Sequence, residues 1–199
     1  MRRTDKPEDR AAETSKMSIF EKASNNEWYV FDSELDTIRG PALRKQAQIN
    51  QLALENEEAA KKELLELFPG IHPSAIVLCP IKVEYPKRLE IGEKTFVHQG
   101  FYHLALGKVT IGKHCFIGPN VHFYTTTHEI SDLERRRAAW QYDEPITVGD
   151  DVWFGGDVIV CPGVTIENNV VIAAGSVVTK DIPPNVIIGG NPAKIIRKI

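Results

Sequence analysis

The segment from Val148 to Pro183 repeats a six-residue pattern without a break, and this repeat constrains the fold more than any other feature of the sequence. Its six consecutive hexads are VGDDVW, FGGDVI, VCPGVT, IENNVV, IAAGSV and VTKDIP. A period of six matches neither the helical repeat of 3.6 residues nor the two-residue alternation of a strand. It is typical of a parallel β-helix, in which three hexads make one triangular coil. The segment therefore predicts two stacked coils, 148–165 and 166–183, rather than ordinary short strands joined by turns.

Weaker hexads precede this segment and predict three further coils. Apolar residues spaced six apart begin at Ile71, resume at Ile91 and resume again at Ile111, with offsets of two residues that indicate corner insertions. The frame halts at His128, and a charged segment, 129–145, intervenes before it resumes. An excursion of this length from a regular coil is either a neutral surface insertion or a functional flap. Its position directly after a histidine favours the flap.

The first third of the chain has a different character. Residues 1–23 are rich in charge and poor in apolar side chains, which predicts a mobile leader. Strong helix formers fill the segment from Asp36 to Phe68, which predicts two helices with a joint near residues 54–56. Leu43, Ala47 and Leu54 are expected to form one apolar helix face. Because a solenoid needs its open ends covered, these helices are expected to form a cap. The predicted segments are leader 1–23, cap 24–70, β-helix 71–188 with flap 129–145, and C-terminal tail 189–199.

Composition excludes several classes of function. The net charge is −3 and the isoelectric point is about 6.1, so nothing indicates a nucleic-acid partner. The three cysteines are widely spaced and form no CxxC motif, which favours a reduced cytoplasmic setting. No apolar run is long enough to span a membrane, and the N-terminus lacks the apolar core of a signal peptide. We therefore expect a cytoplasmic protein without a membrane partner.

The second half of the chain resembles a known family. The sequence GPNVHFYTTTH, the flap, and the stretch from PITVGDDVWFGG to GGNPAKIIRKI are similar to the maltose, galactoside and nodulation-factor O-acetyltransferases, which are hexapeptide-repeat acyltransferases. The resemblance is close from Ile111 to Ile199 and looser from Ile71 to Lys108. It implies a mainly β fold, a left-handed parallel β-helix with an N-terminal α-helical cap. It also implies a homotrimer that binds acetyl-CoA between neighbouring subunits. The left hand opposes the usual preference of crossover connections and does not follow from the hexads.

The resemblance implies specific roles in acetyl transfer. A hydroxyl that attacks a thioester must lose its proton, and histidine suits this task because its ordinary pKa lies near neutral pH. The family's general base corresponds to His128, at the end of TTTH. A backbone N–H in a glycine-lined corner can stabilise the negative charge that develops on the carbonyl oxygen. This role falls to Gly156, beside Trp153 at the cleft. Gly155 and Gly156 could equally serve only to make the corner, and Trp153 could be an apolar surface residue that another subunit covers.

Binding residues for the two substrates are also implied. A pantetheine arm can lie beside small residues, and nucleotide phosphates require cations. The expected acetyl-CoA contacts are Gly155, Ala173, Ala174, Gly175, Thr179, Lys180, Lys194 and Arg197. For the acceptor, the matching positions are Asp32, Glu84 and Gln99. Related enzymes carry FxANF or FxNxN where this chain has FVHQGF, so the sugar, whether maltose, glucose or a galactoside, stays open.

Two alternatives use the same scaffold. Some hexapeptide-repeat proteins are γ-class carbonic anhydrases that hold zinc with three histidines from adjacent subunits. The chain offers His98, His103, His114, His122 and His128, although no pair has the expected separation. The other alternative is a catalytically inert trimeric assembly protein. The preferred function is an acetyl-CoA-dependent O-acetyltransferase that acts by direct transfer, with no metal.

Overall fold

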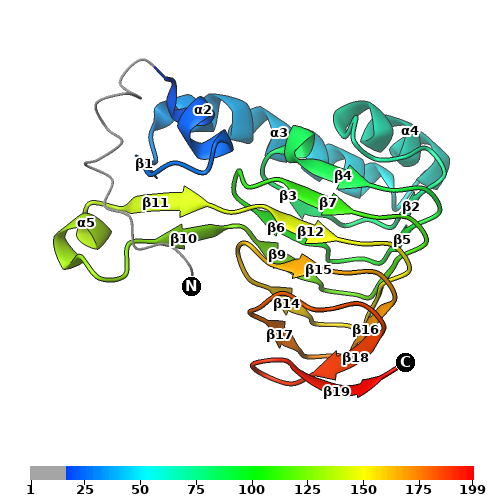
Figure 1. The fold of residues 1–199 in the computed structure, drawn as a ribbon. Coiled ribbons are helices and arrows are strands. Elements are labelled where there is room, and N and C mark those ends of the chain that lie inside the picture. The colour runs from blue at the N-terminus through cyan, green and yellow to red at the C-terminus, as the bar shows by residue number, and fades with distance from the viewer. Residues whose placement is uncertain (1–16) are drawn as a thin grey trace.

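The protein is a stack of triangular coils with a helical cap at one end and a long hairpin at one side (Figure 1). The structure, a computed structural model, describes residues 17–199. Three sheets with parallel coil strands form the faces of the prism, so the predicted left-handed parallel β-helix with an N-terminal cap is confirmed. Residues 1–16 of the predicted leader lie outside the described residues.

We number the three faces in the order in which each coil visits them. Sheet I contains β4 (Leu89–Ile91), β7 (Val109–Ile111), β12 (Ile146–Val148) and β15 (Thr165–Ile166). Sheet II contains β2 (Ile76–Val77), β5 (Phe96–Val97), β8 (Phe116–Ile117), β13 (Trp153–Phe154), β16 (Val170–Ile172), β18 (Val186–Gly189) and β19 (Lys194–Lys198). Sheet III contains β3 (Lys82–Val83), β6 (Tyr102–Leu104), β9 (His122–Tyr124), β14 (Ile159–Val160) and β17 (Val177–Val178).

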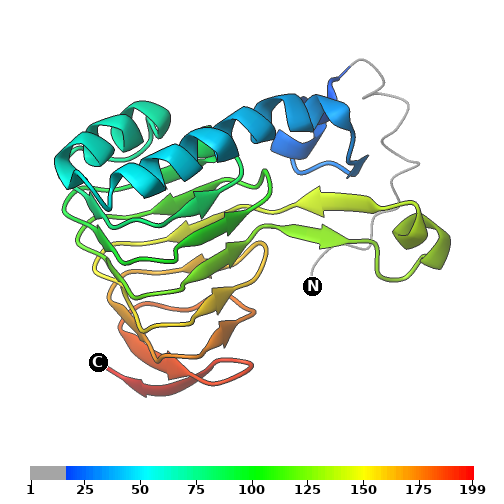
Figure 2. The same cartoon turned by 180° about the vertical axis from the view of Figure 1, so that it is seen from behind.

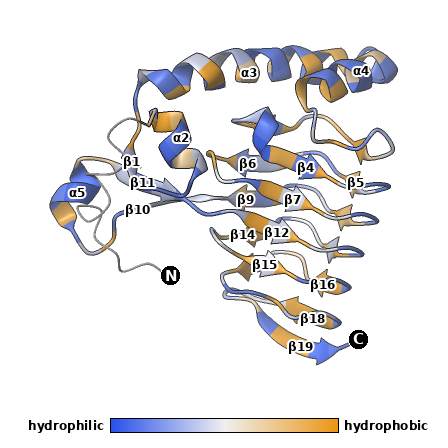
Figure 3. Cartoon of the chain, turned by 45° about the horizontal axis from the view of Figure 1, so that its top comes forward, coloured by the Kyte–Doolittle hydropathy of each residue, from blue (hydrophilic) through white to orange (hydrophobic). Residues whose placement is uncertain are grey.

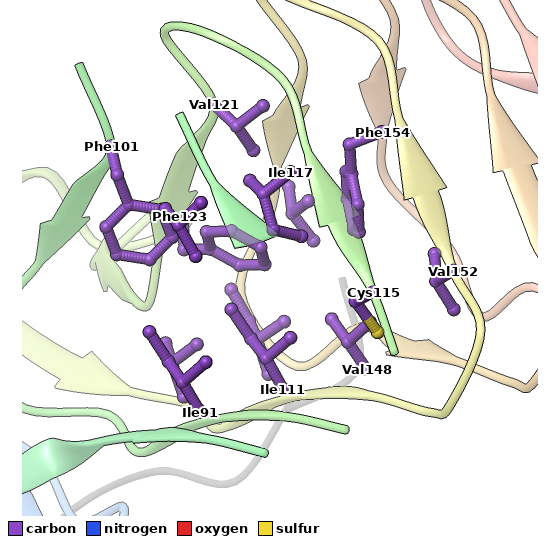
Figure 4. Close-up of a cluster of buried hydrophobic side chains, with 14 of the residues drawn as sticks. Ile91, Phe101, Ile111, Cys115, Ile117, Val121, Phe123, Val148, Val152 and Phe154 are labelled. Atoms are coloured by element: carbon purple, nitrogen blue, oxygen red, sulfur yellow. The ribbon is translucent and has the colours of Figure 1, made fainter. Parts of the chain in front are cut away.

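The core is the apolar column inside the prism, and the hexads produce it directly. Equivalent positions of successive coils pair in register, as Ile111 does with Val148 and Val148 with Ile166. The first-position residues of all six unbroken hexads are at most 2% exposed. Figure 4 shows part of this column, in which apolar side chains from successive coils point toward one another. The ring centroids of Phe123 and Phe154 lie 5.8 Å apart. Each fully buried side chain of this size stabilises the fold by about 2 kcal/mol.

The one polar residue at the interior positions of the six unbroken hexads, Ser176, is satisfied by the backbone. Ser176 is 0% exposed, its hydroxyl donates to the Ala173 carbonyl, and the same oxygen accepts from Gly190 N–H at 3.3 Å. A buried hydroxyl with both roles filled carries little penalty. The exception in the hexad pattern therefore does not interrupt the coil.

The cap closes the open end of the solenoid with side-chain amides. Helix α3 (Ser33–Leu52) lies across the first coil, and α4 (Glu57–Leu67) packs beside it (Figure 2). Gln46 accepts from Val83 N–H at 2.8 Å and donates to its carbonyl at 2.7 Å. Asn50, one helical turn later, makes the same pair of bonds with Ile81. These amides supply the hydrogen bonds that another coil would supply and so protect the terminal edge strand.

We expect Gln46→Met to lower the free energy of unfolding by about 2–4 kcal/mol, because the variant leaves the buried N–H and C=O of Val83 unpaired. Urea denaturation measures the change. Gln48→Met, an exposed position on the same helix, is the matched control and should stay within about 0.5 kcal/mol of the wild type. Equal stability of the two variants would show that the amide does not close the solenoid.

Three details of the cap and tail differ from the sequence-based expectation. Helix α2 (Ile19–Ser24) has a capping box and buries Ala23, so the predicted boundary between leader and cap falls inside a helix. The prediction of the apolar helix face is wrong. Leu54 lies beyond the end of α3 and is 79% exposed, and the buried side of α3 includes Gln46 and Ile49. The segment expected as a tail, 189–199, contains β19, which pairs antiparallel with β18. No helix in the described part of the chain has the length and apolar character that crossing a bilayer requires.

The predicted flap is a projecting β-hairpin. Strands β10 (Thr126–His128) and β11 (Trp140–Asp143) pair antiparallel, and the short helix α5 (Leu133–Arg137) caps the far end (Figures 1 and 3). Strand β1 (Tyr29–Val30) adds to β11 as a third strand. The excursion therefore begins at Thr126, three residues before the predicted start at 129. His128 lies on the hairpin itself, not at a coil corner.

Candidate active site

His128 stands near the base of the hairpin, on its first strand. It lies opposite Gln141 of β11, and Gln141 in turn lies opposite Tyr29 of β1, so three strands fix its backbone. Its side chain is exposed, and its ring makes no hydrogen bond within residues 17–199. The imidazole is therefore accessible to a molecule that binds beside the hairpin.

The hairpin is anchored by a buried carboxylate, Asp143, at the end of β11. Its Oδ2 accepts from the Tyr29 hydroxyl at 2.7 Å, and backbone N–H groups of Leu106 and Gly107 also donate to it. Thr125 lies within 3.4 Å of the other carboxylate oxygen. Burial raises the pKa of Asp143 to about 6, although each of these hydrogen bonds opposes the increase.

A histidine inside the solenoid supports the segment 105–108, which supplies the two backbone N–H groups that bind Asp143. His103 is 0% exposed and its Nε2 donates to the Gly107 carbonyl at 2.9 Å. Burial lowers its pKa to about 4, so the ring is neutral near pH 7. Gly107 has no room for a side chain, because an added Cβ would lie 2.5 Å from the Thr125 Cβ. The two-residue offset seen in the sequence therefore forms a tight turn, 105–108, to which the hairpin is attached.

The two buried groups titrate with opposite effects on stability. The folded pKa of Asp143 is raised, so its stabilising contribution is lost as the pH rises through about 6. The folded pKa of His103 is lowered, so its contribution is lost as the pH falls toward about 4. We expect Asp143→Asn, which removes only the first effect, to lose more stability than the wild type between pH 7 and pH 5, by an additional amount on the order of 1 kcal/mol. Urea titrations at both pH values test this, and identical changes in the two proteins would contradict it.

A second group of predicted residues occupies the corner between sheets II and III, which we call the glycine corner: 98–100, 118–120, 155–157 and 173–175 of successive coils. An added Cβ at Gly155 would lie 2.5 Å from the Ala174 nitrogen, so the coils touch here through their backbones. Gly175 N–H donates to the Gly156 carbonyl at 2.9 Å. Among the backbone hydrogen bonds of the described chain, none is donated by Gly156 N–H. Gln99 stands two coils away in the same corner.

The remaining predicted acetyl-CoA contacts lie near this corner or beyond it. Lys194 pairs with Gly189 in β18, and an added Cβ at Gly189 would lie 3.1 Å from the Ala173 Cβ, so Lys194 is close to the glycine corner. Arg197 lies farther along β19, and both cations are exposed. Thr179 and Lys180 follow β17 and lie on the far edge of sheet III. The structure therefore does not gather all eight residues in one place.

Trp153 lies on the outer face of sheet II, in an apolar ladder that runs across the coils. The register places Ile76, Phe96, Phe116 and Trp153 side by side on successive strands. Ile76, Phe116 and Trp153 are 51%, 59% and 56% exposed. Exposure of such a row of large apolar side chains to water is unfavourable. A row of this kind is typical of an interaction surface.

Two of the predicted acceptor residues lie on the hairpin side of the molecule and already have partners. Asp32 is the N-cap of α3 and accepts from Glu34 N–H at 2.7 Å. Glu84 accepts from Ala105 N–H at 3.2 Å and forms an ion pair with Arg39 at 3.4 Å. Arg39 was not predicted, because its link to Glu84 joins the cap to the solenoid across 45 residues of sequence.

Sequence analysis also missed a polar aromatic cluster on the outer face of sheet III. His122 and Tyr124 share a hydrogen bond of 2.8 Å, Tyr102 packs edge-on against both rings, and Lys82 lies over Tyr102. An open cavity of about 510 Å³ between α3 and this sheet includes Lys82, Tyr102 and His122. The two-residue spacing in VHFY was the available signal, since alternate residues of a strand share a face.

The predicted site residues therefore form two groups on opposite edges of sheet III. Each strand of this sheet enters from the glycine corner and leaves toward the hairpin edge. His128, Asp32 and Glu84 lie at the hairpin edge, whereas Gly156 and Gln99 lie at the glycine corner. Figure 1 shows the hairpin at the left of the body and strands β5, β16 and β18 of sheet II at the right. One chain by itself does not bring His128 to Gly156.

The five histidines considered as zinc ligands are likewise dispersed. His103 lies inside the solenoid, and His114 lies at the corner between sheets I and II. His122 is on sheet III, His98 is at the glycine corner, and His128 is on the hairpin. Over residues 17–199, no three His, Cys, Asp or Glu side chains converge in a way that could hold a metal ion.

Comparison with known proteins places these features in a family. The family model described as "Bacterial transferase hexapeptide (six repeats)" matches residues 145–180, and "Hexapeptide repeat of succinyl-transferase" matches residues 108–122. The chain is 40% identical to the galactoside O-acetyltransferase of Escherichia coli K12 over 144 residues, 71% of this chain and 70% of that protein.

Two solved structures are similar over nearly the whole chain. The maltose O-acetyltransferase of Clostridium difficile 630 superimposes with a TM-score of 0.83 at 35% identity, covering 92% of this chain and 98% of that one. A galactoside acetyltransferase in complex with coenzyme A gives a TM-score of 0.86 at 32% identity, covering 92% of each chain. Both relatives share the solenoid and are named as acetyltransferases. The chain therefore belongs to the hexapeptide-repeat acyltransferases, in the group of the galactoside and maltose O-acetyltransferases, and is an acetyltransferase.

Proposed function

We propose that this acetyltransferase moves the acetyl group of acetyl-CoA to a hydroxyl group of a sugar, with His128 of one subunit as general base. The observation that carries the proposal is the division of the predicted site into two half-sites. The hairpin edge offers an exposed imidazole, and the glycine corner offers a backbone N–H without a partner in the described chain. These are the two groups that acyl transfer to an alcohol requires.

In the proposed reaction, the acceptor oxygen attacks the thioester carbonyl carbon while His128 removes the hydroxyl proton. Negative charge develops on the carbonyl oxygen, and Gly156 N–H donates a hydrogen bond to it. The tetrahedral intermediate collapses with cleavage of the carbon–sulfur bond. The protonated His128 returns its proton to the sulfur, so the products are an acetyl ester and free CoA.

The glycine corner suits the thin pantetheine arm of CoA. Gly155, Ala173, Ala174 and Gly175 present only small side chains along successive coils, and Ala174 and Gly175 are exposed. No heavy atom outside its chain neighbours lies within 4 Å of an ideal Cβ at Gly175, so this position borders open space. Two cations would face the nucleotide phosphates. They are the ammonium of Lys194, beside the corner, and the planar guanidinium of Arg197, farther along β19. A similar galactoside acetyltransferase has been solved in complex with coenzyme A, which supports a CoA site in this protein.

The apolar ladder on sheet II supports an oligomer, which we propose is a homotrimer. Trp153 and Phe116 are more than half exposed in the single chain, and a second copy would cover them. Closed rings of identical subunits repeat one contact, so every hairpin can face the glycine corner of the next copy. Three subunits would then make three equivalent composite sites.

For the acceptor, we propose a site between two copies, where the hairpin edge of one faces the glycine corner of the next. Glu84 and Asp32 are committed to Arg39 and to the N-terminus of α3 respectively, so they would act on a sugar through oxygens that still have unused acceptor capacity. Gln99 at the glycine corner would present its amide to the sugar bound by the neighbouring copy.

We expect Lys194→Ala to raise the KM for acetyl-CoA about fivefold while leaving kcat and the acceptor KM within about twofold, because one charge-assisted phosphate contact contributes roughly 1 kcal/mol. Lys180 lies on the edge of sheet III that a neighbouring copy would bring to the glycine corner, so Lys180→Ala should act in the same direction. Steady-state kinetics at low salt measure the effect. Lys61→Ala, an exposed lysine on α4, is the control and should change neither constant. An effect confined to the acceptor KM would place the nucleotide elsewhere.

The proposed function is tested by incubating the purified protein with acetyl-CoA and a panel of mono- and disaccharides. We expect release of CoA in a one-to-one ratio with an O-acetylated sugar identified by mass spectrometry. Failure of every hydroxylic acceptor to react, with intact acetyl-CoA recovered, would contradict the proposal.

A further inference from the structure

The hairpin that carries His128 depends on one buried carboxylate that the acetyl-transfer chemistry does not use. Asp143 is 0% exposed and lies at the end of β11. It is not among the residues to which the family resemblance assigns a role. In the three-stranded sheet it lies opposite Thr126, two residues before His128. A change in the position of Asp143 therefore moves the strand that holds the imidazole.

The groups that hydrogen-bond this carboxylate come from several parts of the chain. The Tyr29 hydroxyl comes from β1, the N–H groups of Leu106 and Gly107 come from the turn 105–108, and the Thr125 hydroxyl comes from the start of the hairpin. The carboxylate thus joins the cap, the solenoid and the hairpin. Loss of the carboxylate would leave several of these buried donors without a partner, so the anchor holds the three parts together.

The turn that receives Asp143 is itself braced from three sides. His103 donates to the Gly107 carbonyl at 2.9 Å, Arg88 donates to the Leu106 carbonyl at 2.7 Å, and Glu84 accepts from Ala105 N–H at 3.2 Å. Glu84, which pairs with Arg39, therefore holds the first residue of this turn. The predicted acceptor residue Glu84 and the root of the hairpin are thus attached to the same turn. The distal part of the hairpin projects away from the solenoid (Figure 2), so its direction is set at this root.

We propose that Asp143 is a positioning residue for His128: it fixes the hairpin root so that the imidazole of one subunit meets the substrates held by the next. This inference rests on the proposed role of His128 as general base. A displacement of about 1 Å in a catalytic group can lower the rate about a hundredfold. Because Asp143 holds the root of the hairpin, its loss should displace His128 and lower kcat.

The test is a cycle of four proteins: wild type, Asp143→Ala, His128→Ala and the double variant. We expect Asp143→Ala to lower kcat about 30- to 100-fold, with the KM for acetyl-CoA unchanged because the glycine corner is distant from the hairpin root. If Asp143 acts through His128, adding Asp143→Ala to His128→Ala causes no further loss. A multiplicative loss in the double variant would overturn the proposal.

Two further variants separate positioning from general loss of stability. Asp143→Asn keeps the shape and one acceptor oxygen, so it should recover at least tenfold of the kcat lost in Asp143→Ala. Ile111→Ala opens a cavity inside the solenoid, costs about 2–5 kcal/mol, and should leave kcat per folded protein unchanged. If Ile111→Ala lowers kcat as much as Asp143→Ala does, the role of Asp143 is structural only.

Failure of the proposed function would be visible in the wild type alone, as absence of acetyl transfer. In that case hydrogen–deuterium exchange still tests whether Asp143 holds the hairpin in place. We expect Asp143→Ala to speed exchange of hairpin amides between Thr126 and Asp143, while amides of β12 and β13 keep their wild-type protection. Unchanged exchange in the hairpin would overturn the inference independently of any activity.

Discussion

Replacement of His128 by alanine should lower kcat by about 10²- to 10⁴-fold, which is the range for removal of a general base. The KM for acetyl-CoA should stay close to that of the wild type, since the glycine corner does not include this residue. His128 is exposed and lies on the hairpin, so its loss creates no cavity in the core. Stopped assays of CoA release at saturating acceptor measure the effect.

His114→Ala is the matched control for that experiment, because this histidine is also exposed but lies at the corner between sheets I and II. It should retain kcat within about twofold. A His128→Ala variant with near-normal kcat would remove the base from the mechanism and leave only the scaffold of the proposed site.

The second large effect is recovery of activity when two inactive variants are combined. His128→Ala removes the base, and Ala174→Trp fills the space beside the glycine corner from an exposed position. Each variant alone should be inactive. A trimer that contains both variants should regain about a third of wild-type activity, because a composite site needs an intact hairpin from one copy and an intact corner from another, and one of its three interfaces meets this condition.

Co-expression with two affinity tags, followed by kinetics of the doubly tagged oligomer, measures the recovery. The variants mixed after separate assembly, without subunit exchange, serve as the control and should stay inactive. An inactive doubly tagged oligomer would mean that each chain uses its own histidine and its own corner, contrary to the separation of these groups across sheet III.

The solenoid could be predicted because its sequence signal is local and repeated. Every interior position recurs after six residues, so His103 and Ser176 could be placed inside the coils even though they are polar. The cap was predicted as two helices, but its buried face was not. Gln46 and Asn50 are polar residues that face the solenoid to hydrogen-bond strand β3, and an analysis based on hydropathy assigns such residues to the solvent side.

The sequence suggests individual site residues, which stay predictions, but it does not predict how they are arranged. His128 was identified from the motif around it, whereas the hairpin start at Thr126 could not be located, because the polar run TTTH carries no periodic signal. The link between Tyr29 and Asp143 spans 114 residues and leaves no trace in local sequence. For the same reason, only the structure shows that the predicted base and Gly156 lie on opposite edges of one sheet.

A crystal structure with CoA and a bound sugar tests the account most directly. The measured quantity is the distance from the His128 ring to the sugar hydroxyl nearest the CoA sulfur, together with the identity of the subunit that supplies each group. We predict hydrogen-bond distance, about 2.6–3.2 Å, with the imidazole and the Gly155–Gly175 corner belonging to different copies. An imidazole that faces solvent, or one that meets the CoA sulfur bound to its own chain, would contradict it.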